Sequence, residues 1–174
     1  MSMIDDRSLK DFVAESKTLV KALLVKLDEM EGHPELARLF SDCGNLVDRI
    51  MGGAKSLGLQ APKDHGIHIV SDYTSICKIV SYKGAEIERN DDLFNAIHAF
   101  LFDATEILDL LLNRMDSPAS EIKKTISSNF IERLKWISQQ FQKTLSESEG
   151  EISDPVDTSL SQDDIDNLMK KLGV

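Results

Sequence analysis

The chain of 174 residues is long enough for one hydrophobic core of ordinary size plus a tail, and a second full domain is not expected. Its formal net charge of −10 at pH 7 opposes binding to nucleic acid and to anionic membrane surfaces, so neither partner class is expected. Cys43 and Cys77 lie in apolar stretches without a metal-type cluster, which predicts buried thiols in a reducing compartment. No signal-peptide pattern or membrane-spanning run is present, so a soluble cytoplasmic protein is expected.

Apolar residues recur with a helical period along most of the chain, and no strand alternation is sustained. Glycine and proline mark the ends and starts of successive helices. The predicted helices span about residues 6–31, 34–57, 65–82, 90–115 and 117–145. Links this short join antiparallel neighbours, so the sequence predicts an all-α, up-and-down antiparallel bundle of five helices over residues 1–145.

Residues 146–160 have a different character from the bundle. They are rich in serine and acidic residues, and they carry too little apolar surface to offset the entropy cost of ordering. We therefore expect an acidic, flexible linker with a root-mean-square span on the order of 20 Å. Such a linker would hold a terminal segment near the bundle at an effective concentration of about a millimolar.

Residues 161–174 predict a short amphipathic helix. Ile165, Leu168, Met169 and Leu172 recur at i, i+3, i+4 and i+7, which places them in one narrow apolar stripe. Ser161 is a good N-cap for this helix. An isolated helix of about three turns is marginal in water, so the segment should fold on a partner, either another protein or its own domain.

The terminal pattern Ser161-Gln162-x-x-Ile165-Asp166-x-Leu168-Met169-x-x-Leu172-Gly173 resembles the C-terminal helix with which the chemotaxis phosphatase CheZ binds the response regulator CheY. It is also similar to the N-terminal peptide of the flagellar switch protein FliM, which binds the same regulator. Val174 departs from the aromatic terminus of CheZ. The resemblance implies a CheY-like response regulator as partner, with contacts from Gln162, Asp163, Ile165, Asp166, Leu168, Met169 and Leu172.

The second predicted helix has a polar side opposite its apolar stripe. This side carries Arg38, Asp42, Asn45, Asp48, Arg49, Gly52 and Ser56. An exposed glycine inside a helix costs about 1 kcal/mol relative to alanine, and here Gly52 is followed by Gly53. Two explanations are open, namely close approach by a partner and close packing against a neighbouring helix.

The segment Asp48-Arg49-Ile50-Met51-Gly52-Gly53-Ala54 resembles the phosphoacceptor helix of histidine-phosphotransfer (Hpt) domains, above all that of the chemotaxis kinase CheA. The resemblance implies an Hpt-like fold and a face, including Arg49 and Gly52, that meets a response regulator. Asp48 stands at the histidine position and Met51 at the lysine position of the family motif. Phosphotransfer through this site is therefore expected to be lost.

Phosphatases of response regulators resemble one another in placing a side-chain amide, with a carboxylate beside it on the same helix, where it orients the attacking water. Asn45 is the expected amide, with Asp42 or Asp48 as the carboxylate one turn away. The plain alternative is a solvated helix face without catalysis. The segment Gln139-Gln140-Phe141-Gln142 is a fallback source of the amide.

Together these patterns predict a CheZ-like phosphatase that binds a phosphorylated CheY-like regulator and ends its chemotaxis signal. One alternative is a non-catalytic adapter or sink for the phosphorylated regulator, and a weaker one is a phosphotransfer protein. No cofactor is expected on this chain, because Mg²⁺ would be held by the regulator. The sequence leaves open whether the chain forms a homodimer.

Overall fold

The computed structural model describes residues 4–148 and 162–172, and every regular element in those ranges is a helix. This confirms the predicted all-α class. The elements are α1 (Asp6–Met30), the 3₁₀ helix η1 (Pro34–Leu39), α2 (Phe40–Gly58), α3 (Ile67–Ala85), α4 (Asp91–Asn113), α5 (Ala119–Ile122), the 3₁₀ helix η2 (Lys123–Thr125), α6 (Ser128–Ser148) and α7 (Gln162–Lys171).

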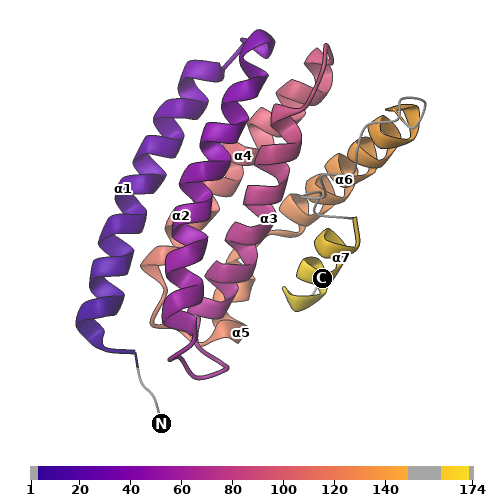
Figure 1. Ribbon diagram of the computed structural model, residues 1–174. Helices are drawn as coiled ribbons and strands as arrows, with labels where there is room; N and C mark the ends of the chain where they lie inside the picture. Colours follow the sequence, from indigo (N-terminus) through magenta and orange to yellow (C-terminus); the bar gives the residue numbers. More distant parts are fainter. Residues whose placement is uncertain (1–3, 149–161, 173–174) are drawn as a thin grey trace.

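The four long helices α1 to α4 lie side by side around one hydrophobic core (Figure 1). Helix α1 contacts α2 and α4, and α3 contacts the same two helices. Helix α6 packs against α4, where the centre of the Phe130 ring lies 4.7 Å from that of Phe100. The same ring lies 5.4 Å from the ring of Tyr73 on α3. The Tyr73 hydroxyl donates to the Ala104 carbonyl at 2.6 Å, so α3 is fixed to α4 by polar as well as apolar contacts.

Helix ends follow local capping chemistry. The carboxylate of Asp5 accepts the backbone N–H of Ser8 at 3.2 Å, and the side chain of Asn90 accepts the N–H of Leu93 at 3.0 Å. Gly32, at φ 73°, makes the turn after α1, in a conformation that favours glycine. These ends agree with the sequence prediction for the first and fourth helices.

Two predicted helices are broken in the structure. The second begins as η1 and becomes α-helical only at Phe40. The fifth, expected from Pro118, is divided into α5, η2 and α6, because Ile126 is extended and Ser127 starts a new helix by accepting the N–H of Phe130 at 3.2 Å. Residues 146–148, predicted as linker, belong to α6. The rest of the predicted linker, together with Ser161, Gly173 and Val174, lies outside the described residues.

Helix α7 packs against α3 and α6 of its own chain (Figure 1). Its apolar side chains Ile165, Met169 and Leu172 are buried there. This is the docking on its own domain that the sequence left open. Within the two described ranges, no helix is both long enough and apolar enough to cross a lipid bilayer.

Candidate functional site

The polar side of α2 faces solvent, as its sequence period predicts. Asp42, Asn45 and Arg49 are exposed and Asp48 is half-buried, whereas the intervening Val47 is buried in the core. Successive side chains one turn apart on a helix point in nearly the same direction. Asp42 and Asn45 therefore form an accessible pair of a carboxylate and an amide on one surface.

The amide of Asn45 is held by a residue of the neighbouring helix α3. The Tyr82 hydroxyl donates to Asn45 Oδ1 at 2.7 Å. Gly44 makes this possible, because a Cβ at that position would lie 2.6 Å from Tyr82 Cε1. The missing side chain lets the Tyr82 ring lie flat against α2, with its hydroxyl next to Asn45.

Asp48 has a cationic partner that the sequence pattern did not indicate. Lys78 Nζ lies 2.7 Å from Asp48 Oδ1, and the same ammonium group is 6.0 Å from the centre of the Tyr82 ring. The side chain of Lys78 is only 26% exposed, so the ion pair is partly shielded from water. Of the two candidate carboxylates, Asp48 is thus engaged within the chain and Asp42 is the more accessible.

Lys78 and Tyr82 were missed by sequence reasoning. Both lie on α3, whose side chains are buried on most of its circumference, so its sequence has no clear polar side. The only available signal was their spacing of four residues, which places a cation and a phenol on one side of the helix. That spacing gives no indication that the side in question meets α2.

The two glycines of the phosphotransfer-like motif have different surroundings. A Cβ on Gly53 would lie 2.9 Å from the Phe12 ring of α1, so Gly53 is explained by helix packing. Within the described part of the chain, no atom lies within 4 Å of the Cβ position on Gly52. The bare backbone at Gly52 therefore opens to solvent beside the Asn45 and Asp48 side of α2.

Two further motif positions are also defined. Met51, at the lysine position of the phosphotransfer motif, is buried, so this position does not reach solvent. Arg49 is exposed and lies 3.5 Å from a carboxylate oxygen of Glu15 on α1. The cation next to Asp48, at the histidine position, is thus Lys78 of α3.

The tail residues expected to contact a partner are divided between two environments. Ile165, Met169 and Leu172 are buried against the bundle, and Leu168 is partly buried. Asp163 is exposed and Asp166 half-exposed, while Gln162 is the first residue of α7. The structure does not bring the tail and the polar side of α2 into one site, because α7 lies against α3 and α6.

The fallback segment lies on α6, where Gln139 and Gln142 are exposed and Gln140 is half-exposed. Phe141 is buried and fixes the segment to the core. No acidic residue stands four residues before any of these glutamines, since those positions hold Lys135, Trp136 and Ser138. On α2, by contrast, Asp42 stands one turn before Asn45.

Burial controls the ionisation of both thiols. The loss of solvation raises the pKa of Cys43 to about 12, with a further contribution from the charge of Asp42, and burial raises the pKa of Cys77 to about 12. Both side chains are free thiols in the core. The predicted burial is confirmed, and neither sulfur has the thiolate character that a nucleophile needs.

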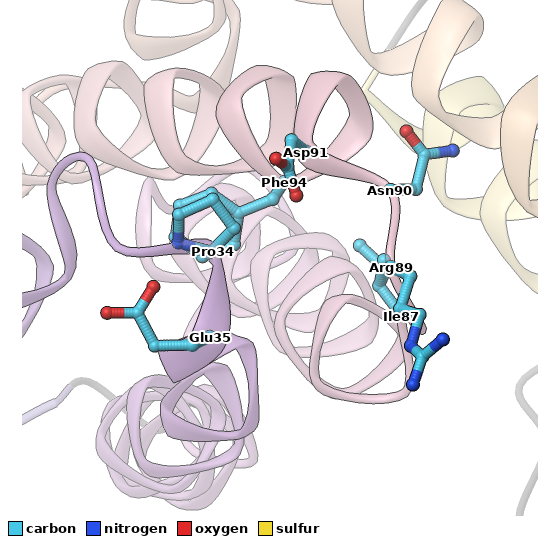
Figure 2. A pocket seen from close by; sticks show the side chains of 7 residues that line it. All are labelled: Pro34, Glu35, Ile87, Arg89, Asn90, Asp91 and Phe94. Carbon is cyan, nitrogen blue, oxygen red and sulfur yellow. The ribbon is translucent and has the colours of Figure 1, made fainter.

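An open pocket of about 350 Å³ lies at one end of the bundle, away from all predicted site residues (Figure 2). Glu35 of η1 and Arg89 of the link between α3 and α4 stand on opposite sides of it, and Phe94 forms part of its apolar lining. Arg89 has a left-handed backbone with φ 48°, and the next residue, Asn90, caps α4. The shape of this pocket follows from the turn that starts α4.

Scans of this chain against protein-family models, curated proteins and solved structures gave no match.

Proposed function

We propose that the chain binds a phosphorylated CheY-like response regulator and promotes hydrolysis of its aspartyl phosphate, on an Hpt-like, up-and-down helical bundle. The proposal is carried by one observation on the described residues. Asp42 and Asn45 are exposed one turn apart on α2, on the helix whose sequence resembles the phosphotransfer motif without its histidine. The terminal motif of α7 supports the class of partner.

Asn45 is the residue that would orient the attacking water. Its Oδ1 already accepts the Tyr82 hydroxyl, which limits rotation of the amide and leaves one lone pair and the amino group for other partners. An amide fixed before the substrate arrives costs little further ordering at the moment of reaction. Tyr82 is therefore a positioning residue, and Gly44 provides the space that it needs.

The reaction needs placement more than covalent help. Water adds to phosphorus while the bond between phosphorus and the aspartyl oxygen breaks, leaving the regulator's carboxylate and inorganic phosphate. Asp42 is placed to accept a hydrogen bond from that water or to pair with a lysine of the regulator. Mg²⁺ is supplied by the regulator. Lys78 places a positive charge next to the Asp48 carboxylate.

A second candidate function is a non-catalytic sink for the phosphorylated regulator. One specific observation favours it, since Asn45 and Asp48 both have partners on α3 and are satisfied without a substrate. In that case these contacts only join α2 to α3. The two functions share the regulator-binding tail. They differ in whether the chain accelerates phosphate release from the regulator.

The test is the rate of phosphate release from a phosphorylated CheY-type regulator, measured with the wild-type chain, Asn45→Ala and Asn95→Ala. Asn95 is an exposed asparagine on α4 and serves as the matched control. The phosphatase proposal expects the acceleration to fall about 100-fold in Asn45→Ala and to persist in Asn95→Ala, with regulator binding kept in both. Binding without any acceleration by the wild-type chain would leave the sink.

A further inference from the structure

The apolar side of α7 is turned toward the bundle. Ile165 and Met169 of this ten-residue helix are 0% and 8% exposed, and Leu172, directly after its end, is 5% exposed. The opposite side carries the exposed Asp163, Asn167 and Lys170. A helix with one narrow apolar stripe has no second apolar side with which to bind another protein at the same time.

The surface beneath α7 is built mainly from α3. Asp72 of α3 is half-buried, and Lys171 of α7 is the cation that favours its charged form most. Ile76 and Ile79 lie about one and two turns beyond Asp72 on the same side of α3, and both are buried. The side of α3 that carries Asp72 thus combines buried apolar residues with one acidic group near Lys171.

The receiver-binding motif and the self-docking residues are the same side chains. The resemblance to the CheY-binding helix rests on Ile165, Leu168, Met169 and Leu172, and three of these four are buried against the chain's own bundle. A receiver domain that takes this stripe must therefore replace α3 and α6 as its cover. The two contacts exclude each other for steric reasons.

We propose that α7 is a self-blocking contact: it packs on α3 and α6 through Ile165, Met169 and Leu172, and the regulator binds only those chains in which α7 has left this surface. This inference rests on the proposed function, because the competing ligand is a CheY-like receiver. The apparent dissociation constant is the intrinsic one divided by the open fraction, so closure weakens binding in inverse proportion to the fraction of open chains. The regulator competes with a surface on the same chain, which α7 meets without a second molecule.

Asp72→Lys tests the contact without changing the tail, because it places a like charge opposite Lys171. We expect backbone amides of residues 166–172 to exchange hydrogen faster in this variant in the absence of regulator. We also expect regulator binding to tighten about threefold to fivefold, the range for replacing a weak attraction between charges by a repulsion near the surface. The charge exchange Asp72→Lys with Lys171→Asp should restore slow exchange and wild-type affinity.

Asp28→Lys is the matched control for net charge. Asp28 is exposed on α1, which lies on the far side of the bundle from α7 (Figure 1). This control should change neither amide exchange in the tail nor affinity for the regulator. A gain of affinity in Asp28→Lys equal to that in Asp72→Lys would assign the effect to overall charge and overturn the inference.

The remaining outcomes separate the inference from the proposed function. Faster exchange in Asp72→Lys with unchanged affinity would overturn self-blocking while keeping regulator binding. Self-blocking would also be overturned if the tail amides of the wild-type chain exchange hydrogen as fast as those of a free peptide. The same holds if Asp72→Lys does not accelerate their exchange. If no variant and no free peptide of residues 162–172 binds the regulator, the proposed function fails first and the inference fails with it.

Discussion

Asp72 is a carboxylate in an unfavourable place. Burial raises its pKa above the usual value, although Lys171, His68, Lys55 and Lys123 all act in the opposite direction. Because the folded state binds this proton more tightly than the unfolded chain, its contribution to stability is fully present below the unfolded pKa. That contribution is lost as the pH rises through the folded pKa. At neutral pH the ionised Asp72 therefore opposes folding.

Asp72→Asn should consequently stabilise the chain at pH 7 and raise its melting temperature. The gain should shrink as the pH falls and vanish below about pH 3, where the carboxyl group is protonated in both states. Urea unfolding of both proteins between pH 3 and pH 7 measures this. A stability difference that is constant across the range would show that the charge of Asp72 is not responsible.

The contacts of Asn45 and Asp48 show where residue-level reading succeeds and where it ends. The period of α2 correctly indicates that these side chains lie outside the core, because Val47 between them and Ile50 after them are apolar. It gives no information about what lies across from them. Their partners Tyr82 and Lys78 belong to another helix, and this pairing is a property of the tertiary packing.

At the level of one element, the glycines of α2 allow a test with opposite signs. Gly52→Ala should stabilise the chain by about 0.5–1 kcal/mol, because the added methyl group meets no described neighbour and alanine favours the helix. Gly53→Ala should destabilise it, because the same methyl group would collide with the Phe12 ring. Thermal and urea unfolding of the two variants measures both changes.

The same pair separates stability from recognition. If a regulator approaches the backbone at Gly52, then Gly52→Ala should weaken regulator binding while it stabilises the fold. A variant that is both more stable and equally tight in binding would show that Gly52 does not face the partner. Gly44→Ala adds a third arm, since its methyl group would push Tyr82 away from Asn45 and should slow phosphate release.

Helix boundaries were predictable where the candidate capping residues lay close together. The sequence offers Asn90 or Asp91 as the cap of the fourth helix, and Asn90 is the cap of α4. Pro118 was expected to start one long helix, but the segment is interrupted and restarted at Ser127. The sequence is compatible with a helix start at Pro118 and with a second start at Ser127. The extended backbone at Ile126 separates the two helices, and no local propensity specifies that conformation.

At the scale of the whole molecule, the all-helical class followed from periodicity, but the place of the tail did not. The spacing of Ile165, Met169 and Leu172 indicates that the segment needs an apolar cover, and any suitable surface satisfies that need. Helix α3, apolar around most of its circumference, is such a surface within reach. Its low amphipathicity could have suggested that it needs a cover on every side.

The cover that α7 gives to α3 has a consequence for truncated proteins. A chain ending at residue 161 would lose the helix that we propose as the regulator-binding segment, and it would also expose the apolar surface of α3 and α6 that α7 covers. We expect this shortened protein to self-associate with increasing concentration in light scattering and to bind a hydrophobic dye that the full chain excludes. A loss of activity in the truncated protein would then reflect self-association as much as the missing helix. A truncated protein that stays monomeric and binds no dye would contradict this expectation.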